Sequence, residues 1–221
     1  METVKLDDRL NIKVFEGDLY IGRSIKDGYG WDRWMIPILE SIDHTDKVIL
    51  DIGANIGACS LMFSYYAPVY AYEPFHIDVL RDNCNQDTVH KITPIGKALS
   101  DSVEHRQFYY HKENCGSGTF NKDPSACELV GEYTSCTLDS EGITEPVSLI
   151  KIDVQGDDLK VLKGAKALLE RDHPVVFVEC ETVQSRLETV AYMYSVGYTV
   201  CRSCPENMLF FEKACSPSIE V

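Results

Sequence analysis

Four short apolar runs, each closed by a carboxylate, recur along the middle of this chain. They span residues 48–51, 69–73, 148–153 and 175–179. Nearly continuous apolar runs of this length are typical of strands buried on both faces of a parallel sheet. Helix-like segments alternate with them, at 58–66, 77–86, 159–170 and 183–196. The alternation predicts an α/β fold with an open, mostly parallel sheet and helices on both of its faces.

The two ends depart from this alternation. Residues 4–22 alternate weakly and predict a small hairpin, and the apolar residues within 31–39 predict a short helix over the sheet edge. Residues 198–201 and 208–211 flank a turn and predict a closing antiparallel hairpin, while 101–146 offers two strands, 107–111 and 135–138, around a polar loop. We expect an N-terminal hairpin and helix (1–46) packed on one domain (47–221), since domains usually contain about 100–200 residues.

The net charge of the chain indicates which kinds of binding partner it lacks the surface for. The chain carries 35 acidic and 21 basic side chains, a formal net charge of −14. It therefore lacks the basic surface that a nucleic-acid binder needs. No apolar run approaches the ~20 residues that span a bilayer, and the first residues do not form a signal peptide, so no membrane partner is expected. Nine scattered cysteines suit reduced thiols, which predicts a cytoplasmic protein.

The first of these strands leads into a loop with two glycines. Gly53 and Gly57 allow a tight turn and a close approach of the backbone to a ligand, and the following helix presents free N–H groups. A dinucleotide fingerprint would need glycines where this chain has Asn55 and Ala58, which disfavours a pyrophosphate and an NAD-dependent dehydrogenase. A ligand that has an amino-acid tail and no phosphate tolerates the bulkier loop. We expect it to bind at Asp51, Gly53, Asn55 and Gly57.

Glu73 ends the next strand, sixteen residues after Gly57. A carboxylate in this place accepts hydrogen bonds from the hydroxyls of an adenosine ribose in other nucleotide folds. The alternative is an acidic residue that only closes a strand before a proline turn. Ala98 and Ser100, after the third strand, are expected to border the adenine.

Several motifs then occur in the order found in one known family. They are Val48–Gly57, Tyr72–Pro74, Thr137–Ser140, Leu149–Gly156 (the most specific), Leu162–Ala165 and Pro174–Glu179. Over about residues 47–181 the chain resembles the FkbM-type methyltransferases. The resemblance implies a class I, Rossmann-like methyltransferase that uses S-adenosylmethionine to methylate hydroxyls of sugars or natural products.

The chain departs from the family pattern at two places. It has Gln155 where the family usually has Glu, and Asp157-Asp158 where the family has Ala-Glu. Two interpretations stay open: the acidic group has moved to Asp158, or Gln155 changes the base or metal chemistry.

An alcohol acceptor must lose its proton during methyl transfer. Asp153, at the end of a central strand, is the first candidate for this role, because ligands bind at the carboxyl ends of the strands in open α/β sheets. His111 is a second candidate, although a lone histidine at a strand end is also typical of the surface. Asp153, Glu179 and Glu181 could together hold Mg²⁺ or Mn²⁺, which would acidify a sugar diol. The alternative is that these carboxylates are helix caps and solvated loop charges.

The sequence thus favours an S-adenosylmethionine-dependent O-methyltransferase with a sugar or glycan hydroxyl as acceptor. Mg²⁺ or Mn²⁺ is an optional second cofactor. Two alternatives remain open: a small natural-product hydroxyl as acceptor, and a non-catalytic module that keeps the nucleotide pocket.

Overall fold

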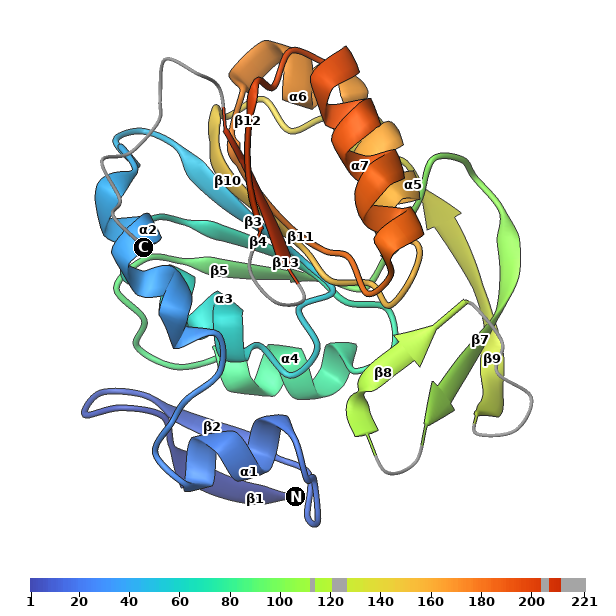
Figure 1. The fold of residues 1–221 in the computed structure, drawn as a ribbon. Coiled ribbons are helices and arrows are strands. Elements are labelled where there is room, and N and C mark those ends of the chain that lie inside the picture. The colour runs from blue at the N-terminus through green and yellow to red at the C-terminus, as the bar shows by residue number, and fades with distance from the viewer. Residues whose placement is uncertain (112–113, 121–126, 204–206, 212–221) are drawn as a thin grey trace.

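The central element of the fold is a seven-stranded sheet. The structure is a computed structural model, and it describes residues 1–111, 114–120, 127–203 and 207–211. The strand order is β12-β13-β11-β10-β3-β4-β5, and Figure 1 labels these strands. The bounds are β3 (Val48–Ile52), β4 (Val69–Tyr72), β5 (Ile92–Ile95), β10 (Val147–Ile152), β11 (Val175–Glu179), β12 (Val200–Ser203) and β13 (Asn207–Phe211). The strands from β11 to β5 are parallel, and β13 and β12 add an antiparallel hairpin. The predicted sheet and closing hairpin are confirmed.

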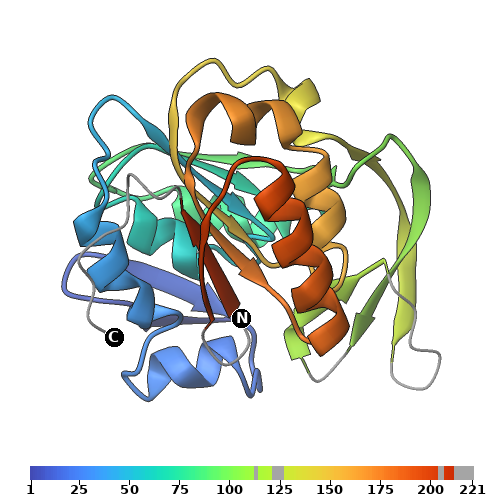
Figure 2. The same cartoon turned by 45° about the horizontal axis from the view of Figure 1, so that its top comes forward.

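Helices cover both faces of this sheet, as predicted (Figures 1 and 2). Every residue of β3 and β10 is buried. Because side chains alternate along a strand, Ile49 joins one core with α2 (Ile36–Ser41), α3 (Ala58–Phe63) and α4 (Ile77–Cys84). Leu50 joins the other, with α5 (Asp158–Lys163), α6 (Lys166–Asp172) and α7 (Val183–Ser195). Within the described ranges, none of the helices combines the length and apolarity that crossing a membrane requires.

The helix predicted over 159–170 is wrong in one respect, because it is two helices, α5 and α6. The break falls at Gly164, where a Cβ would lie 2.0 Å from the carbonyl oxygen of Ser100. The chain therefore passes too close to the loop after β6 (Ala98–Leu99) for any other residue. A residue far away in the sequence holds the start of α6: the Asp139 carboxylate accepts the N–H groups of Ala167 at 2.9 Å and Leu168 at 3.0 Å.

The N-terminal part packs on the same core as the central sheet. It contains the hairpin β1 (Glu2–Lys5) and β2 (Asn11–Val14), then α1 (Ile21–Lys26) and the 3₁₀ helix η1 (Arg33–Met35) before α2. The predicted hairpin is thus shorter than expected, α1 was not predicted, and the helix expected within 31–39 is divided between η1 and α2. Ile12 and Val14 share a hydrophobic cluster with Phe63. The domain boundary at 46/47 stays a prediction.

A second sheet stands beside the first, on the right in Figure 1. Its order is β6-β9-β7-β8. The strand β7 (His105–His111) is antiparallel to both of its neighbours, β8 (Asn114–Thr119) and β9 (Glu128–Cys136), and β6 pairs with β9 in parallel. The sequence predicted only two strands in this region. The strand predicted over 107–111 matches β7, but the one predicted over 135–138 shares only residues 135 and 136 with β9. The sequence also missed β8, whose polar and glycine residues carry no strand pattern.

Candidate active site

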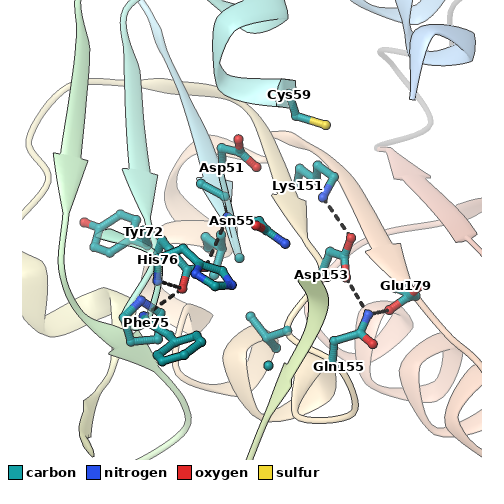
Figure 3. Close-up of a pocket in the computed structure, with 18 of the residues that line it drawn as sticks. Asp51, Asn55, Cys59, Tyr72, Phe75, His76, Lys151, Asp153, Gln155 and Glu179 are labelled. Carbon is teal, nitrogen blue, oxygen red and sulfur yellow. Dashed lines mark hydrogen bonds and ion pairs between the residues drawn. The ribbon is translucent and has the colours of Figure 1, made fainter. Parts of the chain in front are cut away.

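A cavity of about 320 Å³ opens at the carboxyl ends of β3, β4, β10 and β11, shown in Figure 3. It lies where a ligand crevice is expected in an open α/β sheet. The predicted residues that line it are Asp51, Gly53, Asn55, Glu73, Ala98, Asp153, Glu179 and Glu181. Ser100 is instead fully buried and donates its hydroxyl to Asp101 at 3.4 Å. Gly57 turns the chain into α3 against Leu80.

Gly53 is required by the protein's own backbone. Its φ is +81°, and a Cβ there would lie 1.8 Å from the carbonyl oxygen of Asp153. The sequence interpretation, that the glycine gives room for a ligand, is therefore incomplete. Gly53 lets the loop after β3 touch the loop after β10, so the two loops form one continuous wall of the cavity.

Glu73 is 7% exposed, and its carboxylate holds the surrounding turn. Its Oε1 accepts the N–H groups of Phe75 at 2.7 Å and His76 at 2.9 Å, and its Oε2 accepts that of Asn55 at 3.1 Å. Burial raises the pKa of Glu73, although these three backbone donors oppose the shift. Since a carboxylate has about four acceptor positions, Glu73 keeps room for one ligand hydroxyl, not for the two that the sequence suggested.

Asp51 is fully buried below the cavity. Its Oδ2 accepts the hydroxyl of Ser60 at 2.5 Å, and burial raises its pKa. Its Oδ1 is buried and has no hydrogen-bond partner in the part of the chain that the structure describes. Buried polar atoms are rarely left in this state, so Oδ1 suits a positively charged or hydrogen-bonding ligand group.

Four side chains form a continuous row across the ends of β10 and β11 (Figure 3). The Lys151 ammonium lies 3.1 Å from Oδ2 of Asp153. The Gln155 amide nitrogen donates to Oδ1 of Asp153 at 3.0 Å and to Oε2 of Glu179 at 2.7 Å. The Lys151 side chain is 8% exposed and that of Asp153 is 25% exposed. Asp153 is therefore the member of the pair that faces the cavity more openly.

The charges in this row balance one another. Burial opposes the charge on Lys151, but Asp153 holds the pKa of the ammonium well above its usual value. Burial also opposes ionisation of Asp153, yet Lys151 and the Gln155 amide keep its pKa below its usual value. Burial and the Asp153 charge raise the pKa of Glu179 to about 9. At neutral pH the row thus holds an ionised Lys–Asp pair and a protonated Glu179.

This arrangement does not suit the predicted Mg²⁺ or Mn²⁺ ion. Among the described residues, no group of three or more His, Cys, Asp or Glu side chains is arranged to hold a metal. Asp153 and Glu179 are instead joined by the Gln155 amide, and Lys151 occupies the other oxygen of Asp153. Glu181 is exposed at the rim. The expected convergence of Asp153, Glu179 and Glu181 on a cation is not found.

Asp158 does not replace the acidic group that the family has at position 155. Its two carboxylate oxygens accept the N–H groups of Val154 at 3.0 Å and Gly156 at 2.9 Å. Burial raises its pKa to about 6. Asp158 therefore fixes the loop after β10.

His111, the second candidate base, ends β7, where its backbone pairs with Asn114. Its side chain lies outside the described part of the structure. Its role as a base stays a prediction.

Aromatic rings that the sequence analysis did not select form another wall of the cavity. The ring centroids of Phe75 and Phe108 are 5.8 Å apart, and those of Phe108 and Phe120 are 5.1 Å apart. All three line the cavity, with Trp31 from the N-terminal part. Lys151 was also missed. The available signal was a single lysine inside an otherwise apolar strand.

Comparison with known proteins finds relatives in sequence and in structure. The hexuronic acid methyltransferase AglP of Haloferax volcanii is 27% identical over 136 residues, which cover 57% of this chain and 52% of that protein. The chain thus spans about half the length of this curated relative. The crystal structure of methyltransferase FkbM from Methylobacillus flagellatus matches with a TM-score of 0.53 and 19% identity, over 75% of this chain and 43% of that chain. The structural match supports the Rossmann-like fold.

The family model of the methyltransferase FkbM domain matches residues 51–200. This range is more than half of the 221 residues, and it contains the loop after β3, Glu73 and the row from Lys151 to Glu179. The chain belongs to the FkbM methyltransferase family.

Proposed function

We propose that this protein is an S-adenosylmethionine-dependent O-methyltransferase that acts on a sugar hydroxyl. The observation that carries the proposal is that Lys151 and Gln155 both donate to the carboxylate of Asp153 at the edge of a cavity lined by carboxylates and aromatic rings.

The residues at the β3 and β4 ends fit the donor. S-adenosylmethionine supplies a methyl carbon made electrophilic by a sulfonium. Its α-ammonium would satisfy the buried Oδ1 of Asp51, and one ribose hydroxyl would donate to the remaining acceptor position of Glu73. The carboxylates along the cavity favour a cationic ligand. The loop from Gly53 to Gly57 would hold the methionine end, and Ala98 would border the adenine.

Asp153 is the group that would handle the acceptor. A carboxylate with a lowered pKa is a weak base, so Asp153 first orients the hydroxyl by accepting its hydrogen bond. It takes the proton late, as the new C–O bond makes the oxygen acidic. Lys151 keeps Asp153 ionised for this purpose and, with Gln155, fixes the direction of its oxygens.

The aromatic wall suits the apolar face of a sugar ring. Phe75, Phe108 and Phe120 supply flat surfaces beside the carboxylates that bind hydroxyls. The relative from Haloferax volcanii, a hexuronic acid methyltransferase by name, supports the choice of a sugar.

Two measurements test this proposal. Calorimetry should show binding of S-adenosylhomocysteine and not of NAD, and a screen of mono- and oligosaccharides with methyl-labelled donor should yield a labelled sugar. Binding of NAD alone would overturn the proposal. Donor binding with no transfer to any hydroxyl compound would favour the non-catalytic module, and transfer only to non-sugar hydroxyls would favour a natural-product acceptor.

A further inference from the structure

The side-chain amide of Gln155 lies between two carboxylates (Figure 3). Its Nε2 is 3.0 Å from Oδ1 of Asp153 and 2.7 Å from Oε2 of Glu179. A primary amide nitrogen carries two hydrogens. One hydrogen therefore serves each carboxylate, and both donors of the amide are used.

The backbone of Gln155 is held in an unusual conformation that makes this bridge. Its φ is +55°, in the left-handed region that a non-glycine residue adopts only when its surroundings hold it there. The hydroxyl of Thr119, a buried residue of β8, donates to the Gln155 carbonyl at 2.7 Å. Asp158 holds the next N–H group, that of Gly156. The second sheet and the start of α5 thus fix Gln155 from two sides.

Asp153 and Glu179 do not repel each other as two charges, because burial and the Asp153 charge raise the pKa of Glu179 to about 9 and leave it protonated at neutral pH. Lys151 neutralises Asp153 from its other oxygen. What the amide of Gln155 adds is direction, because it donates to both carboxyl groups and fixes the oxygens of Asp153 relative to Glu179.

We propose that Gln155 is a positioning residue whose amide occupies the place of a bridging cation and fixes Asp153 toward the acceptor hydroxyl. The inference rests on the proposed function only for the role of Asp153. If the amide has this role, methyl transfer needs no added metal, and one substitution tests the role directly. Gln155→Glu keeps the size of the side chain but places a third carboxylate between the first two, which creates an oxygen site for a divalent ion.

The first experiment uses the metal alone. Mn²⁺ is titrated into the full chain, and bound ion is measured by electron paramagnetic resonance. Q155E should bind Mn²⁺ at least about tenfold more tightly than wild type, a change of the size that ligand-shell substitutions produce. Q184E is the matched control, because Gln184 is exposed on α7 and donates to Glu188, so this variant also adds a carboxylate beside a carboxylate. Equal Mn²⁺ affinity of Q155E and Q184E would overturn the inference.

The second experiment separates positioning from folding. Q155M keeps the length of the side chain but removes both hydrogen bonds. Its kcat should fall at least about tenfold. Its affinity for S-adenosylhomocysteine should stay within about threefold, because Gln155 is not among the residues proposed to bind the methyl donor. A kcat within twofold of wild type would overturn the inference. If the wild-type protein methylates no sugar, the proposed function fails, and the Mn²⁺ comparison still decides the role of Gln155.

Discussion

The ammonium of Lys151 lies 3.1 Å from Oδ2 of Asp153, and both residues stand at the end of the central strand β10. The lysine side chain is 8% exposed, so its charge depends on this one partner and on the more distant Asp51 and Asp32. The contact has two effects. It compensates the charge of a buried lysine, which stabilises the sheet, and it favours the ionised form of Asp153, which the proposed chemistry needs.

Lys151→Met should lower the free energy of unfolding by about 3 kcal/mol, because removal of one partner from a buried pair leaves the other charge uncompensated. Urea denaturation measures this loss. Lys166→Met is the control, since Lys166 pairs with Glu170 at 3.8 Å with both side chains more than half exposed, and we expect a change below about 0.5 kcal/mol there. Equal losses in the two variants would contradict the structural role of Lys151.

Asp153→Asn should reduce turnover at least about 100-fold, the range that a positioned proton acceptor contributes. The affinity for S-adenosylhomocysteine, measured by calorimetry, should change less than about threefold, because Asp153 faces the acceptor. Asp46→Asn alters an exposed carboxylate at the opposite end of the strands and should leave turnover unchanged. Turnover of the Asp153 variant near that of wild type would remove this residue from the mechanism.

Gly53→Ala should lower the free energy of unfolding by more than the cost of an alanine at positive φ, because the Cβ of the alanine would lie 1.8 Å from the carbonyl oxygen of Asp153. Gly28→Ala supplies the comparison: φ is +82° there, and nothing lies within 4 Å of the new Cβ. We expect a loss of about 1 kcal/mol for Gly28→Ala and at least about 3 kcal/mol for Gly53→Ala. Thermal or urea unfolding measures both. Similar losses would show that the two loops do not touch as described.

Glu179 makes stability depend on pH. Its pKa rises from an ordinary 4.5 to about 9 in the folded protein. Between these values the folded state keeps a proton that the unfolded chain releases, so this contribution to stability is complete below pH 4.5 and is lost as the pH rises toward 9. The slope is on the order of 1 kcal/mol per pH unit. Urea denaturation from pH 6 to 8.5 should therefore show wild type losing stability relative to Glu179→Gln. A difference that stays constant over this pH range would mean that Glu179 is already ionised in the folded protein.

Much of the fold follows from local sequence patterns. The apolar runs predict β3, β4, β10 and β11, because a strand buried on both faces has few other compositions. The division of α5 from α6 could not be predicted, since Gly164 packs on Ser100 and Asp139 holds the start of α6. Both causes are contacts between segments far apart in the sequence.

The same distinction applies to the candidate site. Asp51, Glu73 and Asp153 line the cavity because strands of a parallel sheet end at one edge. The bridge from Asp153 through Gln155 to Glu179 depends on the pairing of Ile152 with Val178 and on a left-handed residue at 155. The sequence alone does not show which strands pair, so Asp153, Glu179 and Glu181 suggested a metal site. The structure instead places the amide of Gln155 between Asp153 and Glu179.

The most direct test of this account is methyl transfer from labelled S-adenosylmethionine to a panel of sugars, with EDTA present throughout and with Asp153→Asn assayed in parallel. The wild-type protein should yield a labelled sugar in EDTA, with no further gain when EDTA is replaced by Mg²⁺ or Mn²⁺, and the variant should give a signal at least about 100-fold weaker. Transfer that appears only with added metal, or an Asp153→Asn variant as active as wild type, would contradict it.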